Sequence, residues 1–367
     1  MIALDATFTT KFGGLPTVTA RAPGRVNIIG EHTDYTGGYV LPVAIPQTTR
    51  LALAPREDRL VRMFSKAFAP LEPETFELGR ESKRGSWVDY VMGTTVALAA
   101  AGHEIRGFDA VIASNVPIGA GLSSSAALEV ALLRALREAF HLDLDDVSLA
   151  KIGRAAETDF VGAPIGIMDQ MAASLADVAT ALFIDTRTLD WTRHPLPPGG
   201  EIVVIDSGIA HDHATGDYAT RRNECERAME LLGVESFRDV TDPARIDELP
   251  DPLRRRARHV ITENARVLEA VACLRTDDLE RLGELLGASH ASLRDDFEVS
   301  VPEVDRLVTL AASDPDVFGA RMTGGGFGGA IVAFARRGSG RAAAERIVAA
   351  YGPAGRALVP EAVEEVA

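Results

Sequence analysis

A segment rich in glycine and serine has the composition of a phosphate-binding loop. It reads Asn115-Val116-Pro117-Ile118-Gly119-Ala120-Gly121-Leu122-Ser123-Ser124-Ser125-Ala126-Ala127. Glycines allow positive φ and close approach of a ligand, and three hydroxyls precede a predicted helix whose N-terminal amides attract anions. The alternative interpretation is a turn whose serine caps the helix. No Gly-Lys-Ser/Thr follows, and the pattern is not a dinucleotide fingerprint, so a Walker loop and a Rossmann site are both excluded.

Two further clusters hold polar groups next to glycines. The first spans residues 24–38 and contains Glu31-His32-Thr33-Asp34-Tyr35, and the second is Arg321-Met322-Thr323-Gly324-Gly325-Gly326-Phe327-Gly328-Gly329. Carboxylates accept hydrogen bonds from the ring hydroxyls of sugars, which makes the first cluster a candidate sugar site. The alternatives are that His32 is a satisfied core histidine and that the second cluster is a tight hairpin.

Asp169 is a candidate general base. It lies in Gly166-Ile167-Met168-Asp169-Gln170, an apolar stretch after Pro164, where a carboxylate would be partly desolvated. The alternatives are that Asp169 caps the helix over residues 170–176, that Arg25 is a surface cation and that Glu157 is a solvated helix carboxylate. His211-Asp212-His213 could suggest a metal site, but no third ligand follows, and a polar loop is the preferred interpretation.

The three clusters, in this order and at these separations, resemble the signatures of the GHMP small-molecule kinase superfamily. Glu31-His32-Thr33-Asp34-Tyr35 resembles the galactokinase family in particular. The resemblance covers residues 21–335 and includes Trp87-Val88-Asp89-Tyr90-Val91 and residues 218–226. It implies ATP-dependent phosphorylation of the C1 hydroxyl of galactose, with Mg²⁺ as cofactor.

The resemblance also implies an α/β (α+β) fold of two domains. The N-terminal domain, residues 1–197, would be ribosomal-S5-like with a left-handed βαβ unit. The C-terminal domain, residues 198–367, would be ferredoxin-like, its last residues packing back on the first domain, and the active site would lie in the cleft between the two.

Roles carried over from the family fall on residues that match its motifs. Asp169 and Arg25 would be catalytic, with Arg25 stabilising negative charge at the transferring group. Sugar contacts fall on Glu31, His32, Thr33, Asp34 and Tyr218. Nucleotide contacts fall on Gly119, Ala120, Gly121, Leu122, Ser123, Ser124, Ser125 and Ser65, and Mg²⁺ would be held by Ser125 and Glu157. Trp87 and Tyr90 would border the adenosine, although their spacing of three residues is also that of ordinary helix packing.

Composition limits the partners. The 38 basic and 53 acidic side chains give a net charge of −15, which disfavours nucleic acid and anionic membranes. Cys225 and Cys273 are the only cysteines, which excludes a disulfide framework and a thiol cluster for zinc. The first 13 residues contain Asp5 and Lys11 and do not form the apolar run of a signal peptide. We therefore expect a cytoplasmic enzyme that acts on galactose and MgATP as a monomer or weak oligomer.

The elements that position these clusters alternate between helix and strand. Strand patterns cover residues 17–21, 39–45, 48–53, 108–113, 181–185, 202–205 and 330–335, and helical spacing covers 87–101, 122–140, 146–160 and 253–274. Pro195-Leu196-Pro197-Pro198-Gly199-Gly200 has the composition of an interdomain linker.

Three departures from the usual galactokinase pattern leave the sugar open. Ile165 and Ala330 stand where cysteines are usual, and Ala219 stands where an asparagine often follows the tyrosine. None removes a catalytic group. The alternatives are another sugar-1-kinase, for example for N-acetylgalactosamine or arabinose, a mevalonate-type or homoserine-type kinase, which Glu31 to Asp34 disfavour, and a non-catalytic sugar sensor.

Overall fold

A computed structural model describes residues 2–68, 72–209 and 214–360. The chain forms two compact units, each assembled from separate segments. Unit 1 comprises Met1–Arg25, Ile45–Pro117 and Ser123–Leu175, and unit 2 comprises Val26–Ala44, Ile118–Leu122 and Ala176–Ala367. These contact-based units do not follow the single boundary expected after residue 197, and the consecutive domains 1–197 and 198–367 stay a prediction. The packing of the last residues, 361–367, lies outside the described residues.

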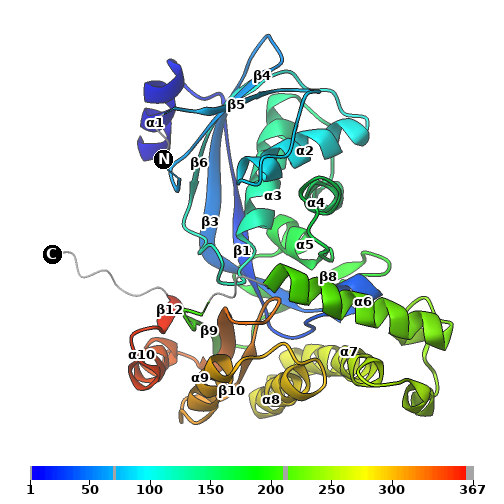
Figure 1. The fold of residues 1–367 in the computed structure, drawn as a ribbon. Helices are drawn as coiled ribbons and strands as arrows, with labels where there is room; N and C mark the ends of the chain where they lie inside the picture. Colours follow the sequence, from blue (N-terminus) through cyan, green and yellow to red (C-terminus); the bar gives the residue numbers. More distant parts are fainter. Residues whose placement is uncertain (1, 69–71, 210–213, 361–367) are drawn as a thin grey trace. The chain divides into compact units, whose positions relative to one another are not determined.

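Unit 1 is built on a five-stranded sheet in the order β1-β3-β6-β4-β5 (Figure 1). Strands β4 and β6 are parallel, whereas β3 with β6 and β4 with β5 are antiparallel. The strands are β1 Val18–Asn27, β3 Pro42–Pro55, β4 Leu60–Ser65, β5 Glu74–Glu77 and β6 Phe108–Ser114. The patterns at 39–45 and 48–53 therefore belong mainly to one long strand, β3, which continues through Pro46.

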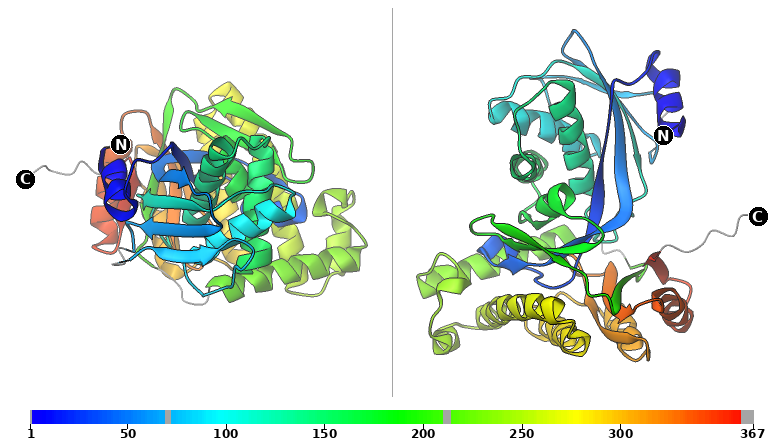
Figure 2. Two further views of the ribbon diagram at one scale, coloured as in Figure 1. Left: turned by 90° about the horizontal axis from the view of Figure 1, so that it is seen from above. Right: turned by 180° about the vertical axis from the view of Figure 1, so that it is seen from behind.

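Helices cover both faces of this sheet. Leu51 and Leu53 of β3 face a core shared with α2, α3 and α4, whereas Ala52 faces α1 and packs near Phe8. Figures 1 and 2 show α1 on one side of the sheet and α2 to α4 on the other. The helices are α1 Ile2–Phe12, α2 Val88–Ala100, α3 Ser124–Ala139, α4 Asp146–Ala155 and α5 Met168–Leu175. Burial on both faces explains the apolar run at residues 110–113 in β6, whereas Asp109 in the same strand is paired with Arg56 and Arg62.

The helix expected over residues 146–160 changes its winding before its end. Helix α4 stops at Ala155, and a π-helix follows over Ala156–Val161. Gly93 of α2 lies directly against it, because a Cβ at this position would be 2.8 Å from the Ala156 carbonyl oxygen. The π-helix places Glu157 in the interior, and π-helical turns of this kind often occur at functional sites.

Unit 2 contains two sheets and five longer helices. An antiparallel sheet has the order β10-β11-β9-β12, and a three-stranded sheet has the order β2-β7-β8. The strands are β2 Tyr39–Val40, β7 Thr180–Asp185, β8 Trp191–Pro195, β9 Gly200–Asp206, β10 Val317–Met322, β11 Ala330–Arg336 and β12 Arg356–Val359. The helices are α6 Ala214–Leu232, α7 Leu253–Thr276, α8 Leu279–Asp295, α9 Pro302–Ala312 and α10 Gly340–Tyr351.

The proline-rich stretch is a tight connection within unit 2. It joins β8 to β9, with the Leu196 amide donating to the Ala179 carbonyl oxygen at 3.0 Å and the Gly200 amide donating to the Pro197 carbonyl oxygen at 3.1 Å. Both flanking strands lie in the same contact-based unit, and the role of this stretch as an interdomain linker stays a prediction, like the boundary itself. Among the residues that the structure describes, none of the helices has the length and apolarity needed to span a bilayer.

Helix α8 lies unusually close to β10, and glycine makes this possible. A Cβ at Gly283 would be 2.0 Å from the Phe318 carbonyl oxygen, and one at Gly319 would be 2.3 Å from the Gly283 carbonyl oxygen. At these two glycines the backbone of α8 therefore packs directly against the backbone of β10.

We predict that Gly283→Ala destabilises the protein by at least about 2 kcal/mol, because the methyl group would force helix and strand apart. Gly287→Ala on the same helix is the control. Nothing lies within 4 Å of a Cβ there, so this change should stabilise by roughly 0.5 to 1 kcal/mol. Urea unfolding followed by circular dichroism measures both, and equal effects of the two variants would contradict the close approach.

Candidate active site

Asp169, at the start of α5, is held by two partners in unit 1. Arg25 Nε donates to Asp169 Oδ1 at 2.8 Å, and Arg25 Nη2 lies 2.6 Å from the same oxygen. Ser123 Oγ donates to Asp169 Oδ2 at 2.5 Å. The Arg25 side chain is 5% exposed and that of Asp169 is 26% exposed, so the carboxylate keeps an open side while its charge is compensated. Arg25 is therefore buried, and its interpretation as a surface cation is wrong.

Ser123 does not cap helix α3. It occupies the N-cap position with φ 60°, but its side chain makes no capping hydrogen bond. The hydroxyl is directed to Asp169 instead. Asp169 is likewise no N-cap, since α5 begins at Met168 and the Asp169 carboxylate is bound to Arg25 and Ser123. Both capping alternatives are wrong for the same reason: each side chain is used in a tertiary contact.

Glu157 lies in a group of buried carboxylates. It is 6% exposed, and burial, followed by the charge of Asp169, raises its pKa to about 7. Hydrogen bonds from Ser125 and Gln170 oppose this shift. Gln170 Nε2 donates to Glu157 Oε2 at 2.9 Å and to Glu129 Oε2 at 3.0 Å. Burial and the Glu157 charge raise the pKa of Glu129 well above its usual value. The interpretation of Glu157 as a solvated helix carboxylate is therefore wrong.

The pair Ser125 and Glu157 is chemically suited to a magnesium ion. Both offer hard oxygen donors, they are joined by a hydrogen bond, and the raised pKa of Glu157 marks negative charge that this region does not fully neutralise. A cation would relieve it. Within the described part of the chain, no three His, Cys, Asp or Glu side chains are arranged to hold a metal. Any ion here would therefore complete its coordination with ligand oxygens and water, which is usual for Mg²⁺.

The phosphate-loop glycines adopt the predicted backbone and contact the second glycine-rich segment within unit 2. Gly119 and Gly121 have φ of 80° and 73°. A Cβ on Gly324 would be 3.0 Å from the Gly121 carbonyl oxygen, and a Cβ on Gly329 would be 3.3 Å from the Ala120 carbonyl oxygen. Residues 324–329 therefore pack directly against residues 120–121. The same run also connects the antiparallel strands β10 and β11, so it is a hairpin loop as well.

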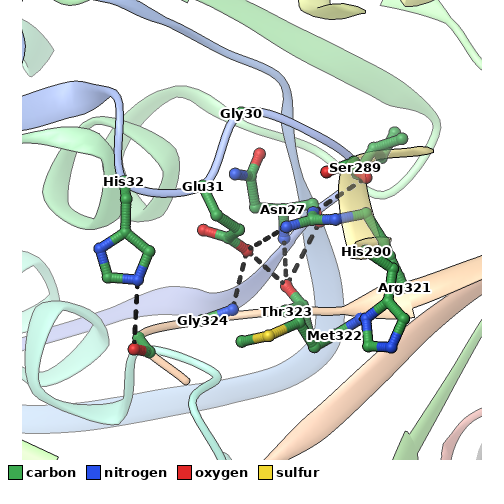
Figure 3. Close-up of polar contacts among 12 residues, drawn as sticks. Asn27, Gly30, Glu31, His32, Ser289, His290, Arg321, Met322, Thr323 and Gly324 are labelled. Carbon is green, nitrogen blue, oxygen red and sulfur yellow. Dashed lines mark hydrogen bonds and ion pairs between the residues drawn. The ribbon is translucent and has the colours of Figure 1, made fainter. Parts of the chain in front are cut away.

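Glu31 is bound to β10 and the loop that follows it (Figure 3). Its Oε1 accepts from the Gly324 amide at 2.8 Å and from Thr323 Oγ1 at 3.1 Å, and it lies 3.4 Å from Arg321 Nη2. Arg321 is fully buried and also donates to the carbonyl oxygens of Asn27 and Ile28. This single carboxylate oxygen therefore has three partners, and all of them belong to the second glycine cluster.

His32 is buried with both ring nitrogens engaged. Nδ1 pairs with the Tyr35 hydroxyl at 3.0 Å and Nε2 pairs with the Gly325 carbonyl oxygen at 3.2 Å. Burial, and next the charge of His259, lowers the pKa of His32 to about 3, so Nε2 donates to the carbonyl and Nδ1 accepts from the hydroxyl. The ring lies 5.1 Å from that of Tyr218 and 4.7 Å from that of Phe297. His32 is thus a satisfied core histidine that packs against Tyr218.

Thr33 and Asp34 have different settings. The Thr33 hydroxyl bonds the carbonyl oxygens of Gly30 and Tyr39 at 3.0 and 2.7 Å, and the residue is fully buried. Its side chain therefore closes the turn. Asp34 begins the 3₁₀ turn Asp34–Thr36 and is half-buried. Of the two, Asp34 is the better placed to meet a ligand.

Three residues in unit 1 were expected near the adenosine. Ser65 ends β4 and is buried, whereas Trp87 precedes α2 and is partly exposed. Trp87 stacks on Phe68, with ring centroids 5.7 Å apart and an interplanar angle of 3°. Burial, and next the charges of Glu157 and Glu129, raises the pKa of Tyr90 to about 12. The exposed Phe68 is a residue that the sequence patterns missed.

Other site residues also escaped the sequence patterns. Arg321 was noted only as part of a glycine-rich motif, and Glu129 and Gln170 were read as parts of a helix and a motif. The signal that could have found Glu129 is a charged residue on an apolar helix face, next to Val130 and Leu133. His211-Asp212-His213 lies outside the described residues.

Three family models match consecutive parts of the chain. Residues 6–55 match the galactokinase galactose-binding signature, 89–177 match the GHMP kinase N-terminal domain, and 270–354 match the GHMP kinase C-terminal domain. The galactokinase of Roseiflexus sp. (strain RS-1) is 46% identical over 342 residues, an alignment that covers 90% of this chain and 87% of that protein. The chain belongs to the galactokinase family.

Other members of the galactokinase family are similarly close. The galactokinase of Chloroflexus aurantiacus is 45% identical over 339 residues, covering 90% of this chain and 86% of that protein. The crystal structure of Lactococcus lactis galactokinase complexed with galactose superposes with a TM-score of 0.92 at 33% identity, covering 97% of this chain and 96% of that chain. A mevalonate kinase structure matches with a TM-score of 0.66 at 17% identity and shares the two-domain GHMP kinase fold.

The raised pKa of Glu157 predicts a pH-dependent stability in metal-free solution. Because the folded state holds its proton up to about pH 7, whereas the unfolded state releases it near pH 4.5, stability falls as pH rises across this window. Glu157→Gln removes this titration. We expect the variant to be more stable than the wild type by about 1 to 3 kcal/mol at pH 8, with little difference at pH 4.

The measurement is urea unfolding with EDTA at both pH values. Asp159→Asn, an exposed carboxylate on the same π-helix, is the matched control and should change little at either pH. Equal stability of Glu157→Gln and the wild type at pH 8 would contradict a strained carboxylate.

Proposed function

We propose that this chain is an ATP-dependent kinase that phosphorylates galactose at its anomeric C1 hydroxyl, giving galactose 1-phosphate and ADP. Membership of the galactokinase family supports the reaction, and the galactose complex of the Lactococcus lactis protein supports the sugar. The observation that carries the chemistry is the Asp169 carboxylate at the start of α5, held by Arg25 and by Ser123, the residue that precedes α3.

Asp169 is proposed as the base. Its Oδ2 would take the proton of the C1 hydroxyl as that oxygen attacks the γ-phosphorus of ATP, and the bond to the leaving ADP oxygen breaks. Arg25 orients the carboxylate, since two guanidinium nitrogens lie within 2.8 Å of Oδ1. The guanidinium would also stabilise negative charge on the transferring group.

The phosphates are assigned to residues 119–125. Gly119 and Gly121 hold the backbone in a conformation in which amides can face an anion, and the three serines follow at the N-terminus of α3. Ser125 and Glu157 would hold Mg²⁺. When bound there, the ion supplies positive charge to the phosphate oxygens during transfer.

Sugar recognition is proposed for Asp34, Glu31, His32 and Tyr218, with Thr33 shaping the turn. Asp34 has the most direct role, because it lies in a turn whose backbone is held by the Thr33 and Thr36 hydroxyls. Glu31 has one oxygen committed to the second glycine cluster, which leaves its other oxygen for the ligand. His32 acts by fixing Tyr35 and packing on Tyr218.

The adenosine is assigned to the region of Ser65, Tyr90 and the stacked pair Phe68 and Trp87, since an aromatic surface suits a purine. Because ATP is an intracellular substrate, the chain is proposed to act in the cytoplasm. It is further proposed to act as a monomer or weak oligomer and to have consecutive kinase domains, 1–197 and 198–367.

A substrate panel tests the function. MgATP is supplied with galactose, glucose, N-acetylgalactosamine, arabinose, mevalonate or homoserine, ADP release is followed, and the products are analysed by ³¹P NMR. We expect galactose to give the highest kcat/KM and a C1 phosphate ester. A preference for another sugar would make the chain a different sugar-1-kinase, and binding of galactose without turnover would make it a sensor.

We predict that Asp169→Asn lowers kcat by about 10² or more, while the Kd for ATP changes little, because the variant loses the proton acceptor and keeps the shape. Asp145→Asn is the matched control: Asp145 caps α4 by accepting from the Ser148 amide, and asparagine caps equally well. Single-turnover kinetics and nucleotide titration separate the two effects. A kcat within threefold of the wild type would reduce Asp169 to a structural role.

A further inference from the structure

The backbone of the candidate sugar segment is held by buried side chains from distant parts of unit 2. Residues 27–39 contain the proposed ligands Glu31, His32 and Asp34. Side chains from elsewhere in the unit bind their peptide groups: Arg321 the Asn27 and Ile28 carbonyls, Thr323 the Asn27 amide, Glu263 the Gly30 amide, His259 the Glu31 carbonyl, Ser236 the Thr36 carbonyl, Arg238 the Gly37 carbonyl, Thr186 the Gly38 carbonyl and Asn264 the Tyr39 amide. A turn bound in this way has little freedom to rearrange.

Three of these side chains come from one face of α7. Glu263 lies one turn after His259 and Asn264 follows it directly, and all three bond peptide groups of residues 30–39. His259 Nε2 donates to the Glu31 carbonyl oxygen at 3.1 Å, Glu263 Oε1 accepts from the Gly30 amide at 2.9 Å, and Asn264 Oδ1 accepts from the Tyr39 amide at 2.9 Å. None of the three belongs to a motif that carries the proposed chemistry.

Glu263 is the centre of this face. Its side chain is fully buried, and it accepts from Ser289 Oγ at 2.7 Å and from Arg266 Nε at 2.7 Å, besides the Gly30 amide. Burial would raise the pKa of Glu263, but the charges of Arg266, His259 and Arg321 and the Ser289 hydrogen bond outweigh this and lower it to about 2. Burying an ionised carboxylate costs free energy unless each of its oxygens accepts hydrogen bonds. Packing alone therefore does not explain why a glutamate occupies this position.

Gly30 shows why the turn needs this anchor. It has φ 105°, and a Cβ there would be 2.6 Å from the Tyr39 carbonyl oxygen. Only glycine fits, and glycine has the most backbone freedom of any residue. The hydrogen bond from its amide to Glu263 fixes the Ile29–Gly30 peptide, one residue before Glu31.

We propose that Glu263 is a positioning residue for the sugar site, acting through the Gly30 peptide to set the geometry of Glu31, His32 and Asp34. The inference rests on the proposed function, because it assigns the sugar to residues 31–34. It makes Glu263 a determinant of galactose binding that touches neither galactose nor ATP.

The test compares Glu263→Leu, which removes the acceptor, with Glu263→Gln, which keeps an oxygen for the Gly30 amide. Ser289→Ala leaves the carboxylate in place and removes only one of its donors. Ile347→Ala is the control for lost stability, since Ile347 is a buried core residue of α10. For each variant, kcat and KM are measured for galactose and for MgATP.

We expect Glu263→Leu to raise the KM for galactose about tenfold or more, with the KM for ATP changed less than threefold. Glu263→Gln should restore most of the galactose affinity, and Ser289→Ala should show a smaller effect in the same direction. Ile347→Ala should lower the unfolding midpoint and leave the ratio of the two KM values unchanged. If Glu263→Leu does not fold, Ser289→Ala carries the test, and an unchanged ratio in that variant contradicts the inference.

Amide hydrogen exchange gives a second readout that does not depend on turnover. Glu263→Leu should speed exchange in peptides that span residues 27–39 more than in peptides from α10, because the anchoring acceptor is lost, and Glu263→Gln should show a smaller effect. Equal exchange in the two regions would overturn the positioning role. Failure of the wild type to phosphorylate galactose would instead overturn the proposed function, and the exchange result would still decide whether Glu263 fixes the turn.

Discussion

The buried guanidinium of Arg321 fixes much of the candidate sugar site. A charged group with no exposed surface must be compensated by nearby acceptors. Arg321 finds them in Glu31 and in the carbonyl oxygens of Asn27 and Ile28, so the segment after β1 must lie against β10. The Glu31 carboxylate in turn binds the Gly324 amide, which places the beginning of the second glycine cluster. One cation therefore sets the position of two motifs that are almost 300 residues apart in the chain.

The glycines of the second cluster impose a second constraint on the site, because only residues without side chains fit there. Gly324 lies against Gly121, and Gly325 lies against the ring of Tyr218, where a Cβ would be 3.3 Å from a ring carbon. Polar attraction brings the segments together, and glycine allows backbone to approach backbone. Either feature alone would be insufficient, since a side chain at Gly324 would push away the loop that carries Gly119 and Gly121.

The sequence patterns identified residues whose roles depend on local backbone structure. The glycines at 119 and 121, the serines after them and the polar residues 31–34 are recognisable because turns and helix starts impose their own residue preferences. Helices α2 and α3 and strand β6 were predicted within about two residues, since their apolar periodicity is strong. The capping roles of Ser123 and Asp169 were wrong alternatives. Capping depends on residues nearby in sequence, whereas these two side chains bond each other from distant parts of the chain.

What remained hidden depends on contacts between distant segments. Arg321, Glu263 and His259 look like ordinary charged or polar residues in a strand and a helix, and only the folded chain shows that they bind the turn at residues 27–31. Chain position also could not separate the roles of Glu157 and Asp169. Asp169 is compensated by Arg25, whereas Glu157 shares its surroundings with Glu129 and is strained. The two carboxylates therefore differ in their electrostatic surroundings. Asp169 is already paired with the cation Arg25, whereas the negative charge of Glu157 is not fully neutralised.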